Sequence, residues 1–225
     1  MKVKLHIYRA DPSSNKEPEY QTFEVDAEPE ETISGVLQYI YENIDPTLAF
    51  RFVCNMQKCG VCAVAVNKSP CLACERRVEP EMTIDPLPNL PVIKDLVIDR
   101  HKVISSIFNM APLLKKSGTA DTGLAASTET PDIAIKLGEC IECLVCQSVC
   151  PVIGNHPETF VGPLGLLWLT QKSIYCPSRT SDWDKEIGNA LEMCNFCGRC
   201  WKVCPHELNV LDSVFEKLKH LRRRK

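Results

Sequence analysis

The sequence predicts an α+β protein with two domains, a small mixed sheet with one helix over residues 1–105 and a helical domain over residues 106–225. In the first part, apolar and polar residues alternate over short runs, as they do in half-buried strands. The second part repeats one cysteine spacing and has helical stretches with almost no strand pattern. Residues 112–131, rich in Lys, Ser, Thr, Gly and Ala, are expected to form a surface connection.

The elements of the first domain each have a local signature. Residues 3–9 alternate, a turn rich in Pro, Ser and Asn follows, and residues 22–25 alternate again, which is typical of a hairpin. Thr32 can cap a helix over residues 33–41, where apolar positions recur every three or four residues. Further short strands are expected at residues 61–66 and 82–84, with a turn at residues 67–70.

Several protein classes are excluded by the same sequence. The first residues contain no uninterrupted apolar stretch like that of a signal peptide, so we expect reduced thiols in a cytoplasmic protein. The apolar run at residues 160–169 is far shorter than the roughly 20 residues of a membrane-spanning helix, so no transmembrane segment is expected. A formal net charge of −3 gives no basis for nucleic-acid binding.

The first cysteine set has the spacing Cys-x4-Cys-x2-Cys of a plant-type 2Fe-2S cluster. A fourth thiolate must come from further along the chain, and both Cys71 and Cys74 are candidates. The one that is not used is expected to be a small buried hydrophobe. Gly60 stands where the backbone must turn tightly around a cluster, and an ordinary loop glycine is the alternative. The three closely spaced ligands are Cys54, Cys59 and Cys62.

The other two sets each have the spacing Cys-x2-Cys-x2-Cys-x3-Cys-Pro. In this pattern three thiolates hold one 4Fe-4S cluster, and the cysteine before the proline ligates the other cluster. We therefore expect two 4Fe-4S clusters, each dependent on both copies of the repeat. The expected ligands of the first are Cys140, Cys143, Cys146 and Cys204, and those of the second are Cys194, Cys197, Cys200 and Cys150.

Zinc is the alternative occupant, because Cys-x2-Cys pairs also build tetrahedral zinc sites. Zinc sites usually close with two such pairs, whereas triplets followed by Cys-Pro are typical of 4Fe-4S clusters. Cys176 is interpreted as a spare buried thiol, and none of the five histidines has a spacing that requires a ligand role.

Four segments carry a resemblance to a known family: residues 72–74 (LAC), 91–100 (PVIKDLVIDR), 140–151 (CIECLVCQSVCP) and 161–167 (VGPLGLL). Through them the chain resembles the iron-sulfur subunit of succinate dehydrogenase and fumarate reductase over almost its full length. The resemblance implies that Cys74 is the fourth 2Fe-2S ligand. It also implies a β-grasp ferredoxin-like N-terminal domain, an all-α ferredoxin-like C-terminal domain, and electron transfer between an FAD-bearing flavoprotein and a quinone-reactive membrane anchor.

Two departures from that family pattern affect the expected partner. Most members lack the second cysteine of the last quartet and hold a 3Fe-4S cluster, whereas Cys197 completes a 4Fe-4S set here. Most members also have tryptophans and a histidine near the quinone, where this chain has Gly154, Asn155 and Asn195. In this respect the chain resembles family variants that have a second 4Fe-4S cluster. Those variants commonly work with a cysteine-rich subunit like that of heterodisulfide reductase.

The sequence thus predicts an electron-transfer subunit without catalytic residues, its FAD lying on the partner flavoprotein. The alternative is the same electron module in a complex that acts on another organic acid or enoate. A structural or regulatory metal protein is a third hypothesis, but stability alone would need fewer clusters. We expect a cytoplasmic location, with association to the inner face of the cell membrane made only through partners.

Overall fold

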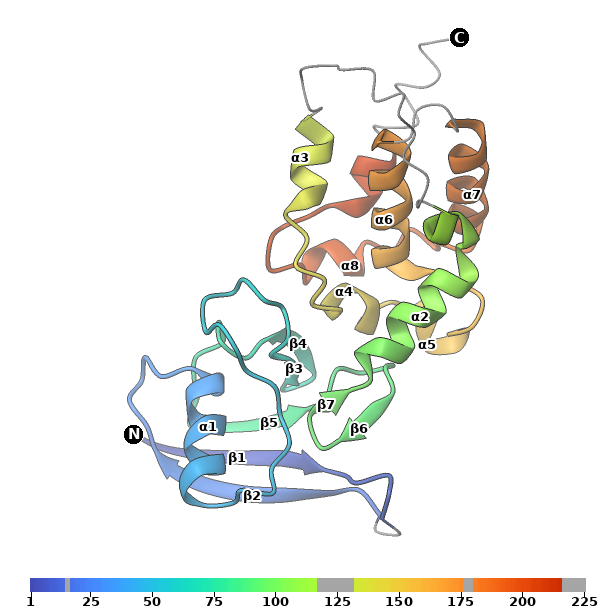
Figure 1. The fold of residues 1–225 in the computed structure, drawn as a ribbon. Helices are drawn as coiled ribbons and strands as arrows, with labels where there is room; N and C mark the ends of the chain where they lie inside the picture. The colour runs from blue at the N-terminus through green and yellow to red at the C-terminus, as the bar shows by residue number, and fades with distance from the viewer. Residues whose placement is uncertain (15–16, 117–131, 176–179, 216–225) are drawn as a thin grey trace. The chain divides into compact units, whose positions relative to one another are not determined.

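The computed structural model describes residues 1–14, 17–116, 132–175 and 180–215 (Figure 1). The chain forms two compact units. The first comprises Met1–Arg100 together with Ile141–Ser148, and the second comprises His101–Cys140 together with Val149–Lys225. Residues 141–148, which contain Cys143 and Cys146, therefore belong to the same unit as the N-terminal residues.

A five-stranded mixed sheet with the order β2-β1-β5-β3-β4 forms the centre of the first unit (Figure 1). Strand β1 (Lys2–Arg9) pairs antiparallel with β2 (Glu19–Asp26), which confirms the predicted hairpin, and parallel with β5 (Glu81–Asp85). Strand β3 (Ala63–Val66) pairs antiparallel with both β5 and β4 (Ser69–Leu72). The alternation seen in the sequence places Val3, Leu5 and Ile7 of β1 in the core.

The turn between β3 and β4 is shorter than the sequence predicts. Only Asn67 and Lys68 lie outside the strands, with φ of 49° and 67°. Two consecutive residues with positive φ are characteristic of a tight type I′ hairpin loop. The turn therefore closes over two residues, and Ser69 and Pro70, expected in the turn, belong to β4.

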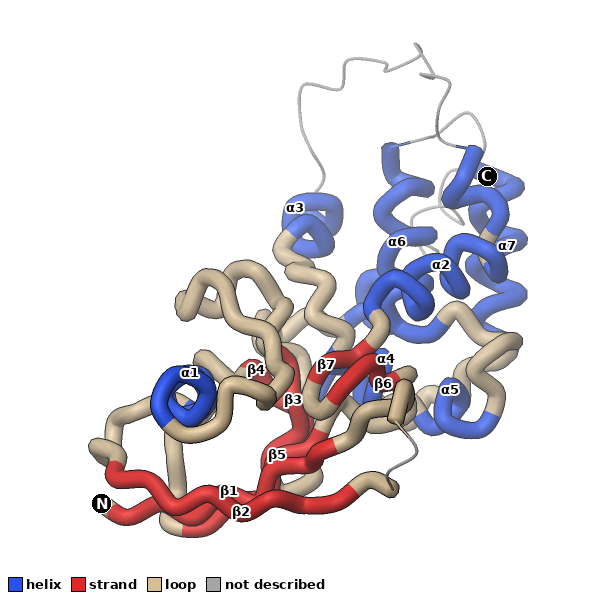
Figure 2. Tube along the Cα trace, turned by 60° about the horizontal axis from the view of Figure 1, so that its bottom comes forward, coloured by secondary structure: helices blue, strands red, loops and turns tan. Residues whose placement is uncertain are grey.

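Helix α1 (Ile33–Asn43) lies against this sheet, as Figure 2 shows. Thr32 is its N-cap, and the Thr32 Oγ1 accepts a hydrogen bond from the Gly35 backbone N–H at 3.2 Å. Ile33, Val36, Leu37 and Ile40 form the buried face, with the spacing that the sequence indicates.

A two-stranded hairpin of β6 (Val92–Lys94) and β7 (Val97–Ile98) completes the strands of the described residues. Asp95 lies in its turn with φ of 44°, and its carboxylate is buried. That carboxylate accepts hydrogen bonds from the backbone N–H groups of Ala10 and Ala49, at 3.0 and 2.8 Å. The hairpin thereby ties the end of β1 to the segment that leads into the first cysteine loop.

The described elements after Arg100 are helical. Helix α4 (Val145–Ser148) belongs to the first unit, and α2 begins at the last residue of that unit's first segment. The others are α2 (Arg100–Met110), η1 (Pro112–Lys116), α3 (Asp132–Gly138), α5 (Pro151–Asn155), α6 (Gly162–Tyr175), α7 (Thr180–Glu192) and α8 (Arg199–Lys202). The all-α prediction also covers residues that the structure does not describe, among them most of the 112–131 connection, and so it stays a prediction.

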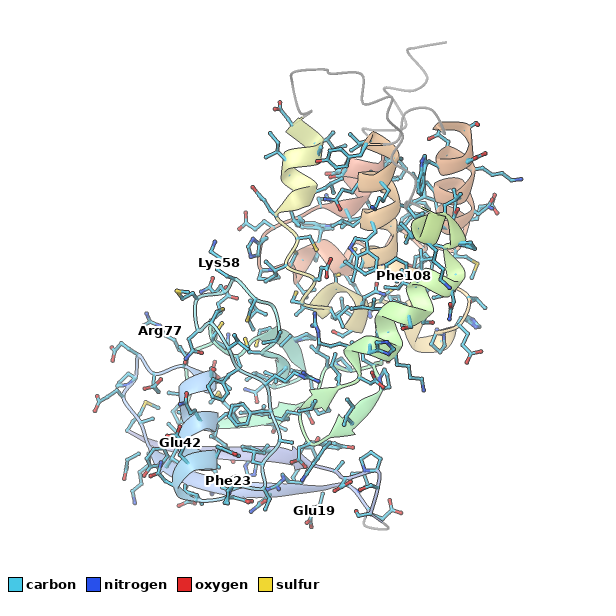
Figure 3. The ribbon with its side chains drawn as sticks, viewed as in Figure 1. Glu19, Phe23, Glu42, Lys58, Arg77 and Phe108 are labelled. Atoms are coloured by element: carbon cyan, nitrogen blue, oxygen red, sulfur yellow. The ribbon has the colours of Figure 1, made fainter. Side chains whose placement is uncertain are left out.

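Helix α6 is the centre of the second unit and packs against α3 and α7. Within the apolar run at residues 160–169, Phe160, Leu164, Leu166 and Leu167 are buried. Trp168 stacks on Phe108 of α2, labelled in Figure 3, with ring centroids 5.4 Å apart. No helix in the described part of the chain is long and apolar enough to span a membrane.

Candidate iron-sulfur centres

The first cysteine loop has a backbone suited to an anionic group. Asn55, Gln57 and Gly60 have φ of 49°, 58° and 66°. Where residues with positive φ adjoin residues with negative φ, successive backbone N–H groups point into one concavity. Such concavities bind anions and are found at many iron-sulfur sites. The Met56 N–H donates to the Cys54 Sγ at 3.4 Å. Hydrogen bonds from the Met56 and Lys58 N–H groups lower the pKa of the Cys54 thiol to about 6, which favours the thiolate that a metal requires.

Helix α1 positions this loop relative to the segment that supplies the fourth cysteine. The Ser34 hydroxyl donates to the Asn55 Oδ1 at 2.9 Å, which fixes the loop to the first turn of the helix. The Ser34 backbone N–H donates to the Ala73 carbonyl at 2.9 Å, which fixes the segment next to Cys74. Helix α1 therefore supports both segments that carry predicted ligands.

Cys74 lies beside Cys62, whereas Cys71 lies on the face of β4 opposite to the buried Pro70 and Leu72. The Ala73 N–H donates to the Cys62 carbonyl at 3.1 Å, and both Cys62 and Cys74 are buried. Burial raises the pKa of the Cys62 thiol to about 12, and the neighbouring Cys74 side chain adds to that increase. In β4, Pro70 and Leu72 point into the core, so Cys71 lies on the opposite face. Burial raises the pKa of Cys71 to about 11.

The two cysteine repeats share one backbone conformation. Glu142 and Phe196, at equivalent positions, both have φ of 53°, and Leu144 and Gly198 have φ of 67° and 72°. Left-handed conformations are uncommon for residues other than glycine. Their recurrence at equivalent positions indicates that both repeats require the same loop conformation. The Phe196 N–H donates to the Cys194 Sγ at 3.4 Å, the same contact that Met56 makes with Cys54.

Four of the predicted ligands line one cavity in the second unit. Phe160, Pro163 and Leu166 supply apolar walls to this cavity. Burial raises the pKa of the Cys150 thiol, and it raises the pKa of the Cys200 thiol to about 11. In both cases the neighbouring cysteines in the cavity raise the pKa further. The four cysteines are Cys150, Cys194, Cys197 and Cys200. Cys150, from the other repeat, therefore lines the same cavity as the last triplet. Its assignment as a ligand of that triplet's cluster stays a prediction.

The predicted ligands of the remaining centre are divided between the two units. Cys143 and Cys146 belong to the first unit, and Cys140 and Cys204 belong to the second. Their assignment to one cluster stays a prediction. Cys176 lies outside the described residues.

No group of three or more His, Cys, Asp or Glu side chains within the described ranges is placed to hold a single metal ion. The ligands of an iron-sulfur cluster surround a larger inorganic core. The fit to such a core therefore rests on the loops with positive φ and on the cavity lined by four cysteines.

Two contacts in the first unit were missed by sequence reasoning. A side chain at Gly60 would meet the Ile141 carbonyl, since an added Cβ would lie 2.5 Å from that oxygen. Glycine is therefore required at position 60 for two reasons, its positive φ and the close approach of the segment that carries the predicted ligand Cys143. Arg100 donates to the Glu142 carbonyl at 2.7 Å. The sequence offered no signal for either contact, because both join segments far apart in the chain.

Comparison with known proteins defines the class to which these sites belong. Residues 4–105 match the family described as a 2Fe-2S iron-sulfur cluster binding domain, and residues 136–208 match the 4Fe-4S dicluster domain. The chain therefore combines a ferredoxin-like 2Fe-2S domain with a 4Fe-4S dicluster domain.

Its relatives give the particular family. The fumarate reductase iron-sulfur subunit of Escherichia coli O6:H1 is 31% identical over 225 residues, which cover 94% of this chain and 90% of the relative. One chain from the Mycobacterium smegmatis Sdh1 complex in the apo form has the same fold, with a TM-score of 0.77 at 23% identity over 100% of this chain and 97% of the other. The chain belongs to the family of iron-sulfur subunits of fumarate reductase and succinate dehydrogenase.

Other relatives are much longer. A fumarate reductase (CoM/CoB) subunit of Methanothermobacter marburgensis is 30% identical over 217 residues, which cover 96% of this chain but 44% of that protein. An iron-sulfur protein of Methanococcus maripaludis is 33% identical, with 39% of its length covered. The chain thus spans less than half the length of these curated relatives.

Proposed function

We propose that this chain is an electron-transfer subunit that carries electrons between an FAD flavoprotein and a second redox partner. The observation that carries the proposal is the cavity that brings Cys150 together with the last cysteine triplet. A stability site would need only one local set of ligands, whereas ligands shared between repeats hold two centres close to one another. Iron-sulfur clusters supply reversible one-electron transfer when bound.

We assign one 2Fe-2S cluster and two 4Fe-4S clusters to the three cysteine sets. In this assignment the 2Fe-2S ligands include Cys74, which is supported by its place beside Cys62. The four cysteines of the cavity hold one 4Fe-4S cluster, and Cys140, Cys143, Cys146 and Cys204 hold the other. The sheet order and the helix α1 support a β-grasp domain over residues 1–105, followed by an all-α domain over residues 106–225.

The flavoprotein docks on the N-terminal domain in this proposal. Val53 and Met56, which flank Cys54, are 74% and 67% exposed, and Phe52 is exposed beside them. Exposed apolar side chains grouped around a ligand loop are typical of a surface that a partner covers. Electrons from the flavin therefore reach the 2Fe-2S centre first.

The second partner is a cysteine-rich subunit like that of heterodisulfide reductase, with a quinone-reactive membrane anchor as the alternative. Asn195 stands where most members have histidine, which disfavours the usual quinone contact. A similar relative from Methanothermobacter marburgensis, of whose length this chain covers 44%, is named a fumarate reductase (CoM/CoB) subunit, which supports a redox partner other than a quinone. We further propose a cytoplasmic location, with the membrane reached only through such a partner.

The test is anaerobic purification with metal counting and EPR. About ten iron atoms per chain and three reducible centres are expected, the sum of one two-iron and two four-iron clusters. Zinc in place of iron, or a colourless protein, contradicts the proposal. A copurified flavoprotein whose substrate is succinate or fumarate should bleach or restore the visible absorbance. A response only to another enoate favours the alternative complex.

A further inference from the structure

Arg100 lies between the two ligand loops of the first unit. Its Nη2 atom donates to the Glu142 carbonyl at 2.7 Å, and its Nη1 atom lies 3.5 Å from the Gly60 carbonyl. Gly60 follows Cys59, and Glu142 precedes Cys143. One planar guanidinium therefore faces a carbonyl of each loop, which a single ammonium group could not do with the same geometry.

The two loops touch at the point that Arg100 bridges. An added Cβ at Gly60 would lie 3.1 Å from both the Cα and the Cβ of Cys143. The backbone next to Cys59 is thus in direct contact with a predicted ligand of the following centre. Close contact between ligand loops shortens the distance that an electron must cross.

The charge of Arg100 acts on both loops. Arg100 is half buried, and burial lowers its pKa, while the neighbouring Cys143, Glu142 and Cys59 raise it. An arginine remains protonated in proteins, so the site holds a fixed positive charge. In a partly buried position this charge is less screened by water than one at the surface.

We propose that Arg100 is a positioning residue for electron transfer, which holds the Glu142–Cys146 loop against the Cys59–Cys62 loop and favours the reduced state of both centres. The inference rests on the proposed function, because it requires clusters at these cysteines. A cluster gains negative charge on reduction, so a nearby cation raises its reduction potential.

The test compares Arg100→Gln with wild type as the full holoprotein with its partners, by EPR-monitored redox titration. We expect the potentials of the 2Fe-2S centre and of the 4Fe-4S centre containing Cys143 to fall. The oxidised-to-reduced ratio at a fixed potential should change by about tenfold, which is about 59 mV for a one-electron couple. The magnetic interaction between the two reduced centres should weaken as well. Unchanged potentials and interaction at full iron content overturn the inference.

Two further variants complete the experiment. Arg51→Gln removes an exposed positive charge close enough to affect Arg100, and it should shift the potentials by much less. Equal shifts in Arg51→Gln and Arg100→Gln overturn the inference. If Arg100→Gln does not load iron, Arg100→Lys is tested in its place. This variant should keep the reduction potentials near those of wild type but weaken the magnetic interaction between the two reduced centres. An unchanged interaction overturns the inference. Failure of the proposed function differs from all of these results, because wild type itself would then show no iron-sulfur signal.

Discussion

The Oδ2 atom of Asp95 accepts a hydrogen bond from the backbone N–H of Ala49 at 2.8 Å. Through it, the β6–β7 hairpin holds the segment that enters the Cys54 loop. The other carboxylate oxygen accepts from the Ala10 N–H and lies 3.2 Å from the Nε of Arg9. Each oxygen of this buried carboxylate therefore has a polar partner, which offsets the cost of removing it from water.

Asp95→Asn should therefore destabilise the protein by about 1–3 kcal/mol, because an amide places donors where the backbone N–H groups need acceptors. The measurement is the urea midpoint of unfolding, followed by circular dichroism. Asp26→Asn at the exposed end of β2 is the matched control and should change the midpoint little. Equal effects of the two substitutions would show that Asp95 does not hold the segment.

Acid should weaken the contacts of Asp45. Hydrogen bonds from the Thr47 hydroxyl and from Arg9 hold the pKa of Asp45 well below its usual range. Because the folded-state pKa is depressed, this stabilisation is complete above the unfolded pKa of about 4 and is lost as the pH falls toward the folded value. The difference in urea midpoint between wild type and Asp45→Asn should shrink as the pH is lowered from about 6 to about 3. A difference that stays constant with pH contradicts this assignment.

Cys74→Ser and Cys71→Ser form a matched pair on the same short segment. Cys74 lies beside Cys62, so its replacement should remove the 2Fe-2S signal and about two iron atoms per chain. Cys71 lies on the other face of β4, so Cys71→Ser should leave the iron content unchanged. The reverse result would exchange their roles.

Cys150→Ser should damage the centre held by the last cysteine triplet. The reason is the shared cavity, in which Cys150 lies with Cys194, Cys197 and Cys200. EPR of the reduced variant should show the other 4Fe-4S signal largely retained. Loss of that other signal first would show that the ligands do not cross between the repeats.

Cys197→Ser should convert one 4Fe-4S cluster to a three-iron species. Cys197 is the most exposed of the four cavity cysteines, and its loss leaves three thiolates in place. The oxidised protein should gain a 3Fe-4S EPR signal, with about one iron atom fewer per chain. A spectrum identical to wild type would mean that another residue replaces Cys197 as ligand.

The sequence by itself determined the features that depend on neighbours along the chain. Ligands spaced by two or four residues lie on one loop, so the spacing predicts the type of centre without a fold. The sequence also predicts β1 and α1. The alternation in β1 and the recurrence of apolar residues every three or four positions in α1 each extend over enough residues to be recognised. Strands β6 and β7, of three and two residues, are too short to show alternation, and sequence reasoning did not predict them.

Only the tertiary structure decided which distant segments meet. It placed Cys74, one of two candidates, next to Cys62, Gly60 against the Ile141 carbonyl, and Arg100 against the Glu142 carbonyl. Each of these contacts joins residues brought together by packing and backbone hydrogen bonds across the fold. No local pattern encodes such a contact, because its free energy arises only when the segments are already folded against one another.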